Sequence, residues 1–373
     1  MILQGDALTK LKELKEKSVN MVMTSPPYWA LRDYGSDVET IWDGDENCKH
    51  EFEVKERRLH GGTMKEDFGC SRGTREMTDW KTKDGFCQKC GAWKGQLGLE
   101  PTFDLYIKHL CDIFDEVKRV LRDDGTCWVN LGDTYYSKSG GKFQNDNISN
   151  KQRNDASGIS KANKLKEGKE LEQKNLTLIP FRFAIEMQNR GWILRNVIIW
   201  HKPNCMPSSV KDRFTVDFEY IFFFSKKKKY YFEQQLEPVK LQSIHRTKYK
   251  WEGHREKMSA YEGMDIKNMC KGEGRNKRAV WEIKPKGFKE AHFAVYPEKL
   301  CETPIKAGCP KDGIVLDPFF GAGTTGLVAL KQGKKFIGIE LNPEYIEIAK
   351  KRLAPYKEQT KLNFLKVKKT EIK

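Results

Sequence analysis

The segment TSPPYW, near the start of the chain, combines groups that could act on a polar substrate. Ser25 carries a hydroxyl, Pro26 and Pro27 present carbonyl oxygens, and Tyr28 and Trp29 are aromatic. The two prolines fix two φ angles and remove two backbone donors, which the interior of a sheet does not tolerate. An apolar run leads directly into this segment. The pattern therefore predicts a strand that ends in a rigid corner lined with hydrogen-bond acceptors.

A second candidate site lies near the other end of the chain, in DPFFGAGTTGLVAL at 317–330. Gly321 and Gly323 let the backbone bend sharply and approach a ligand. The next apolar run ends in Glu340, whose carboxylate can accept hydrogen bonds from ribose hydroxyls at the carboxyl end of a strand. The glycine pattern is neither a Walker loop nor G-x-G-x-x-G. Together these features predict a site for a nucleoside-type cofactor.

Four side chains in a polar, glycine-rich stretch have the chemistry of a zinc site. Cys87 and Cys90 form a C-x-x-C knuckle followed by glycine, which brings two thiolates to one metal. Cys48 and His50 are a less usual pair, and the segment between the two pairs can close as a loop at modest entropic cost. Cys70 is a substitute ligand. We expect a structural zinc ion rather than a catalytic one.

Two of these segments resemble the motifs of a known family, the amino-directed DNA methyltransferases. DPFFGAGTT with GIELNPEY resembles their S-adenosylmethionine site, and TSPPYW resembles their catalytic motif. The catalytic motif comes first and the cofactor motif last, which resembles the β group. HFAVYPEKL (292–300) resembles the N-terminal cofactor motif, EYIFFFSK the eighth motif, and GD (5–6) the opening of the catalytic strand. The resemblance covers most of the chain outside 43–98 and 137–175. It implies S-adenosyl-L-methionine contacts from Asp6, Thr24, Phe293, Pro297, Asp317, Pro318, Phe319, Gly321, Gly323, Thr324, Thr325, Glu340 and Asn342.

The resemblance implies which reaction the residues of the TSPPYW corner assist, namely methylation of an exocyclic amino group. An exocyclic amino group on a base is a poor nucleophile, and fixed acceptors for its hydrogens assist it as it becomes tetrahedral. Ser25, Pro26, Pro27 and Tyr28 are the predicted catalytic residues, with the Ser25 hydroxyl and the Pro26 carbonyl as acceptors. Tyr28 can stack on a base swung out of the duplex, and Trp29 lines the target-base pocket.

The choice of base is less sharply indicated. The adenine enzymes of this family usually carry Asp or Asn where this chain has Ser25, and S-P-P-Y more often accompanies cytosine N4 methylation. We therefore expect cytosine N4, with adenine N6 as the alternative. Methylation of a protein glutamine or an RNA base uses N-P-P-Y and a cofactor-first order, which this chain lacks. A zinc-containing DNA-binding protein with an inactive methyltransferase fold is a more distant alternative.

The charge of the chain favours a polyanionic partner. Its formal net charge is +16, and Lys and Arg outnumber Asp and Glu in 227–290, where the β group places target recognition. Basic residues position phosphates and only some side chains read base edges, so Arg246, Lys248, Arg275 and Arg278 are candidate DNA contacts. Double-stranded DNA is the expected partner, and a cognate restriction endonuclease is a second candidate.

The elements that must position these residues alternate between strands and helices. Strands are predicted at 19–23, 126–132, 192–200, 219–226, 313–317 and 335–340, and helices at 7–16, 101–121, 179–191, from the glycine turn to 332, and at 343–353. This alternation predicts an α/β fold with a doubly wound, mostly parallel, Rossmann-like sheet in circular order.

The predicted domains follow from that alternation and from changes in composition. They are 1–42 with 99–226 (catalytic half), 43–98 (zinc insertion), 137–175 (mobile loop), 227–290 (target recognition), 291–356 (cofactor half) and 357–373 (basic tail). No apolar run is long enough to cross a membrane, and the first residues have no signal pattern. We expect a cytoplasmic protein of a prokaryote or phage, with its cysteines as thiols or metal ligands.

Overall fold

The computed structural model describes residues 1–31, 39–57, 80–136, 171–238, 274–285 and 295–370, with backbone alone for 53–57, 80–84 and 357–370. The chain divides into two compact units. The larger comprises Met1–Pro26, Leu110–Thr134 and Leu176–Lys373, and the smaller comprises Pro27–His109 and Tyr135–Asn175.

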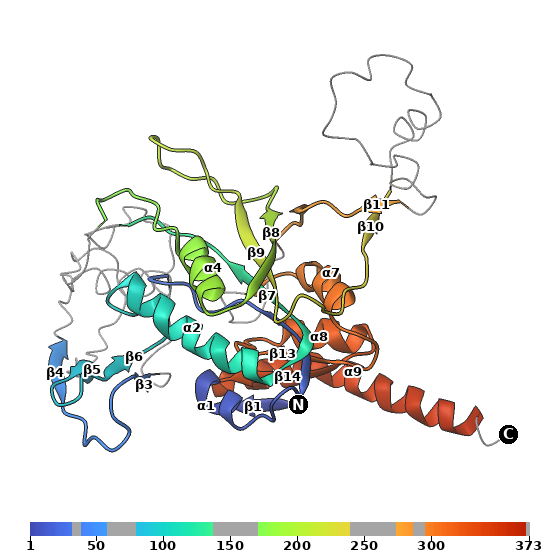
Figure 1. Ribbon diagram of the computed structural model, residues 1–373, viewed down its shortest axis with the longest axis horizontal. Coiled ribbons are helices and arrows are strands. Elements are labelled where there is room, and N and C mark those ends of the chain that lie inside the picture. The colour runs from blue at the N-terminus through green and yellow to red at the C-terminus, as the bar shows by residue number, and fades with distance from the viewer. Residues whose placement is uncertain (32–38, 58–79, 137–170, 239–273, 286–294, 371–373) are drawn as a thin grey trace, which may run out of the picture. The chain divides into compact units, whose positions relative to one another are not determined.

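An eight-stranded sheet forms the centre of the larger unit (Figure 1). In spatial order its strands are β1 (Ile2–Gln4), β14 (Lys335–Glu340), β13 (Ile314–Asp317), β2 (Val19–Thr24), β7 (Leu121–Leu131), β9 (Phe218–Ser225), β8 (Ile193–His201) and β12 (Val280–Glu282). Every neighbouring pair is parallel except the two that contain β9, which runs antiparallel to β7 and β8. The predicted mostly parallel α/β sheet is confirmed, and the reversal of β9 makes it mixed.

The two central strands come from opposite ends of the chain. β13 pairs with β2 through Val315 and Met21 and through Leu316 and Val22. Because these strands are parallel to each other and to β14 and β7, their carboxyl ends meet at one edge of the sheet. The predicted catalytic and cofactor segments begin at that edge.

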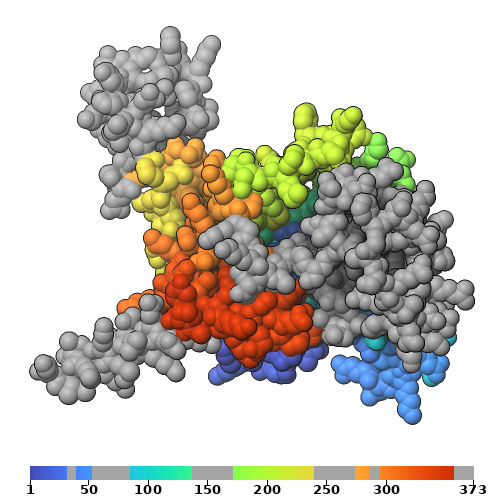
Figure 2. Space-filling model, turned by 180° about the vertical axis from the view of Figure 1, so that it is seen from behind, coloured from blue at the N-terminus to red at the C-terminus, as the bar shows by residue number. Residues whose placement is uncertain are grey.

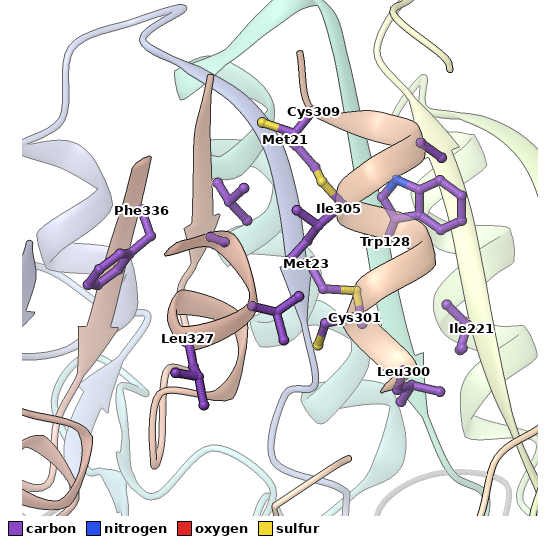
Figure 3. Packing of buried hydrophobic residues seen from close by; sticks show 14 of the residues in the cluster. Met21, Met23, Trp128, Ile221, Leu300, Cys301, Ile305, Cys309, Leu327 and Phe336 are labelled. Carbon is purple, nitrogen blue, oxygen red and sulfur yellow. The ribbon is translucent and has the colours of Figure 1, made fainter. Parts of the chain in front are cut away.

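Helices cover both faces of this sheet, which explains why its strands are apolar on both sides. The helices are α1 (Ala7–Lys12), α2 (Phe103–Val120), α4 (Ile179–Asn189), α7 (Glu298–Gly308), α8 (Thr324–Lys331) and α9 (Pro343–Thr370). On one face α7 and α8 pack on a buried cluster that includes Met21, Met23 and Trp128 (Figure 3). On the other face Phe183 of α4 lies edge-on to Phe222 and Phe224 of β9.

Two helix predictions have wrong ends. The first helix stops at Lys12 instead of Glu16, because the N–H of Leu14 bonds to the carbonyl of Leu11, three residues back, in a tighter turn that ends the helix. The last helix runs to Thr370 instead of ending near 353, even though it contains Pro355. The residues after this proline are rich in Lys and include Leu, Glu and Gln, all of which are good helix formers. Within the described part of the chain, no helix is long and apolar enough to span a membrane.

The smaller unit contains an antiparallel sheet of β3 (Thr40–Trp42), β6 (Trp93–Gly95), β5 (Trp80–Cys87) and β4 (Phe52–Arg57), in that order. It is larger than the predicted insertion at 43–98, because it also holds the end of the TSPPYW corner and the start of α2. In the predicted recognition region, β10 (Leu236–Glu237) pairs with β11 (Arg275–Asn276). Most of the predicted mobile loop and of the recognition region lies outside the described residues.

Candidate active site

The predicted site residues of the larger unit lie at the carboxyl ends of four adjacent parallel strands, β1, β14, β13 and β2. Ser25 follows β2, Asp317 ends β13 and Glu340 ends β14. β1 lies beside β14, with Gln4 paired to Glu340, so Asp6 follows at the same edge. Asp6 caps α1 by accepting a hydrogen bond of 2.9 Å from the backbone N–H of Thr9. In α/β sheets this edge is where ligands bind.

Asp317 is a buried hub that joins the catalytic strand to the glycine turn. Its carboxylate accepts hydrogen bonds from the hydroxyls of Thr24 (2.6 Å), Thr325 (2.7 Å) and Tyr296 (3.1 Å) and from the N–H of Phe319 (3.1 Å). Burial raises the pKa of Asp317, and the Thr24 and Thr325 hydroxyls oppose that rise. The hub fixes the end of β2, and therefore Ser25, relative to the turn.

The glycine turn is held from its other side by Glu340. The Oε2 atom of Glu340 accepts a hydrogen bond of 2.7 Å from the N–H of Gly321, and Oε1 accepts one of 2.8 Å from the N–H of Asn342. Burial raises the pKa of Glu340, and these two donors partly offset the rise. Gly323 begins α8 with a φ of +78°, and a Cβ there would lie 3.0 Å from the Cβ of Ala349. Both the backbone conformation and the space therefore require glycine at this position.

Burial separates the predicted cofactor residues into two groups. One group is only partly buried at the carboxyl edge and consists of Asp6, Pro297, Phe319, Gly321, Glu340 and Asn342. The other group is buried and consists of Thr24, Asp317, Pro318, Gly323, Thr324 and Thr325. The hydrogen bonds of Thr24, Asp317 and Thr325 give these residues a supporting role behind the turn. Their direct contact with a cofactor stays a prediction, and Phe293 lies outside the described residues.

The Ser25 hydroxyl belongs to a hydrogen-bond network of polar side chains that was not predicted from the sequence. Its hydroxyl donates to Oδ1 of Asn130 at 3.4 Å, and the amide of Asn130 donates to Oε2 of Glu219 and to the carbonyl of Tyr220, each at 3.1 Å. Lys202 pairs with the other oxygen of Glu219. Asn130 is a buried polar residue in the otherwise apolar last part of β7, residues 127–131, and that exception was the available signal.

The rest of the corner is anchored within the smaller unit. The carbonyl of Pro27 accepts a hydrogen bond of 2.7 Å from the hydroxyl of Tyr106. The indole N–H of Trp29 donates to the carbonyl of Glu100 at 3.0 Å, and its ring lies edge-on to Phe103. The side chain of Trp29 is 3% exposed, so it fixes the corner from inside the unit. Its predicted place in a base pocket stays a prediction, whereas Tyr28 is only partly buried.

A buried ionisable pair supports this anchor. Glu100 is fully buried, and its two carboxylate oxygens lie 3.1 Å from Nδ1 of His109 and 2.7 Å from the donating N–H of Gly98. Burial raises the pKa of Glu100, and His109 opposes the rise. The imidazole ring of His109 stacks with both Trp42 and Trp93, at centroid distances of 4.7 and 5.6 Å. These contacts link the small sheet to the segment that holds Trp29.

Comparisons with known proteins show the family to which this chain belongs. A DNA methylase family model, which groups N6 and N4 methyltransferases, matches residues 19–351. The chain belongs to this DNA methylase family. The Type II methyltransferases M.Cfr9I of Citrobacter freundii and M.SmaI of Serratia marcescens are each 35% identical to it over 352 residues. That match covers 94% of this chain and 87% and 90% of the two relatives. A solved cytosine-N4-specific PvuII DNA methyltransferase shares the fold, with a TM-score of 0.51 and 18% identity over 94% of this chain and 85% of that one.

The smaller unit of this DNA methylase contains a cluster of potential metal ligands. One ligand atom from each of Cys48, His50, Cys87 and Cys90 lies within 4.8 Å of all the others. A zinc ion bound by thiolates at about 2.3 Å needs sulfur atoms roughly 3.8 Å apart, which is close to this spacing. Burial opposes ionisation of Cys87, but backbone N–H groups of Cys90 and Lys89 lower its pKa to about 6. The cluster therefore has the donor types and the spacing that zinc requires.

The predicted DNA contacts of the methylase are only partly described. Arg275 and Arg278 both donate through Nε to the same carboxylate oxygen of Glu237, at 2.9 and 2.6 Å. Arg246 and Lys248 lie outside the described residues. Base reading by Arg275 and Arg278 stays a prediction, and the ion pairs fix the position of both side chains beside β10 and β11.

Proposed function

We propose that this DNA methylase transfers a methyl group from S-adenosyl-L-methionine to the N4 amino group of a cytosine in double-stranded DNA. The observation that carries the proposal is a serine, rather than Asp or Asn, after β2, at the edge where β13 leads into the glycine turn. The β-group order, with TSPPYW first and DPFFGAGTT last, agrees with it. The cytosine-N4-specific enzyme with the same fold supports the choice of base.

The residues at the carboxyl edge suit a nucleoside cofactor with a cationic sulfur. Asp6 and Glu340 place carboxylates at the ends of two neighbouring strands, where they can accept hydrogen bonds from ribose hydroxyls and amino groups. Phe319 and Gly321 are only partly buried, so a flat ring can approach the glycine turn. Bound by these residues, S-adenosyl-L-methionine supplies an electrophilic methyl group.

The corner prepares the target amino group for that methyl group. An extruded cytosine stacks on Tyr28, and its amino hydrogens are accepted by the Ser25 hydroxyl and the Pro26 carbonyl. Ser25 directs its own proton toward Asn130, which orients the hydroxyl oxygen as an acceptor. The acceptors stabilise the amino nitrogen as it becomes tetrahedral and positively charged. The methylated nitrogen then loses a proton to solvent, so the corner needs no strong base.

We also propose that Cys48, His50, Cys87 and Cys90 bind a structural zinc ion. The four ligands lie on β5 and on the loops beside it, in the unit that anchors Pro27 and Trp29. Four protein ligands leave no open position for a substrate, which is typical of a structural rather than a catalytic zinc site. The ion would therefore stabilise the small sheet without taking part in methyl transfer.

Nucleoside mass spectrometry and methylome sequencing of DNA from a host that expresses the chain test the proposed reaction. N4-methylcytosine in one sequence context supports it and identifies the recognition site. N6-methyladenine would show that the proposed target base is wrong, but it would still support methyl transfer to an exocyclic amino group. A Ser25→Ala, Tyr28→Ala variant, expressed to the same level, gives the background of modified bases in the host DNA. If the wild-type chain raises neither modified base above that background, the proposal is contradicted.

A further inference from the structure

A long exposed loop joins β8 to β9 in the larger unit and covers residues 203–216. A hydrogen bond of 2.7 Å from the N–H of Lys202 to the carbonyl of Asp217 closes its base. Figure 1 shows the loop extending away from the sheet in yellow-green, and the same colour projects at the surface in Figure 2. Every residue of the loop is exposed except Cys205, which is partly buried, so the loop is an element of the surface.

The loop places large apolar side chains in solvent. Phe214 is 94% exposed and Met206 is 88% exposed, and Val210 and Val216 are exposed as well. Single exposed apolar residues are ordinary, but four on one loop form a surface that another molecule can cover. Among the large apolar side chains of the described residues, Phe214 is the most exposed, and it lies on this surface loop.

The charges beside Phe214 indicate which molecule covers it. Lys211 and Arg213 lie within three residues of the ring, with Asp212 between them, and Lys202 stands at the base of the loop. Lys and Arg beside an apolar tip suit the phosphates and stacked bases of a nucleic acid. Exposed apolar tips of this kind insert between base steps in proteins that unstack DNA.

The loop also starts at the edge of the sheet where the reaction takes place. β9 runs antiparallel to both β7 and β8, so β8 runs in the same direction as β2 and β7. Its carboxyl end therefore lies at the same edge as Ser25. A chain of side-chain contacts joins the two places, from Ser25 to Asn130, on to Glu219, and finally to Lys202.

We propose that loop 203–216 contacts double-stranded DNA and inserts Phe214 into the base stack where the target base leaves it. This proposal rests on the base extrusion contained in the proposed function. Extrusion costs the stacking and pairing energy of one base, and the cost is lowest for a base that is already mismatched. The Phe214 ring offsets part of the cost by stacking on the bases that remain. Lys211 and Arg213 hold the loop on the phosphates.

The test compares Phe214→Ala with Val280→Ala, which removes a 64% exposed apolar side chain from a different element. Single-turnover methylation is measured on the mapped duplex and on the same duplex with a mismatch opposite the target base. On the matched duplex Phe214→Ala should be slower than wild type by roughly 10-fold, the scale of one base–aromatic contact. On the mismatched duplex the deficit should shrink to within about twofold of wild type, because the extrusion cost is already reduced.

The control variant should match wild type on both duplexes, and both variants should unfold at the wild-type temperature. An unchanged rate for Phe214→Ala on the matched duplex would overturn the proposal. An equal deficit on both duplexes would overturn it as well, because it would mean that Phe214 does not act on extrusion. If sedimentation shows that Phe214→Ala dissociates a wild-type dimer without changing DNA rates, the loop binds a second copy instead. A wild-type enzyme that methylates no DNA overturns the proposed function itself, which is a separate result.

Discussion

The hydrogen bond between Thr24 and Asp317 gives a quantitative test of the hub. Thr24→Val keeps the shape of the side chain and removes only the hydroxyl, which donates to a carboxylate oxygen at 2.6 Å. Both residues are buried, so water cannot replace the lost donor. A hydrogen bond to a charged group contributes roughly 1.5–3 kcal/mol. We therefore expect the free energy of unfolding to fall by about 2 kcal/mol.

Urea denaturation of wild type and variant measures this difference, and Thr9→Val provides a matched control. The Thr9 hydroxyl also donates to an aspartate, Asp6, but at 3.2 Å and in an exposed position. An exposed bond of this kind contributes little, and the control should lose no more than about 0.5 kcal/mol. If Thr24→Val destabilises the protein no more than Thr9→Val does, Asp317 does not hold the catalytic strand in the way inferred above.

The remaining predictions concern the reaction, the cofactor, the metal and DNA. Ser25→Ala should slow single-turnover methyl transfer by roughly 10²-fold with DNA affinity unchanged, since its hydroxyl acts mainly in the transition state; a wild-type rate would contradict this. Because burial raises the pKa of Glu340, its carboxylate gains a proton at a higher pH than an exposed glutamate does. Calorimetry should therefore show that the cofactor affinity of wild type weakens as the pH is lowered, starting above the pH at which an exposed glutamate gains its proton, whereas Glu340→Gln should show little pH dependence. Elemental analysis should find one zinc per chain, and a Cys87→Ser, Cys90→Ser double variant that keeps full metal would exclude the cluster. Log affinity for DNA should fall with log salt at a slope near −4 to −5 if about five phosphates are neutralised, and a flat response would mean that the basic surface does not face DNA.

The sequence predicted six of the eight strands of the large sheet because their signals are local, and it missed the short edge strands β1 and β12. Apolar runs bounded by turns located β2, β7, β9 and β14 to within a few residues, apart from the start of β7, and the glycine turn located the start of α8. The direction of β9 was not predictable in the same way. A fully apolar strand looks alike in parallel and antiparallel pairing, and only the neighbours it meets decide between them.

The supporting contacts of the site could not be predicted because they join distant parts of the chain. Asn130 bonds Ser25 across 105 residues, and the partner of Asn130, Glu219, lies a further 89 residues on. The polar Asn130 among apolar neighbours indicates a buried polar contact, but nothing in the sequence identifies Ser25 or Glu219 as its partner. Trp29 shows the same limit in another way, because an aromatic residue beside a catalytic motif can face either the site or the interior.

The pairing of β2 with β13 affects how the protein is made. Thr24 meets Asp317 across 293 residues of chain, so the ribosome must synthesise nearly the whole protein before the two central strands can pair. At about 5–20 residues per second this delay is roughly 15 to 60 s. Throughout that time one edge of the apolar strand β2 has no native partner, and unpaired strand edges of this kind are prone to aggregate. Slow, non-local pairing should therefore make the yield of folded enzyme sensitive to chaperones and to growth temperature.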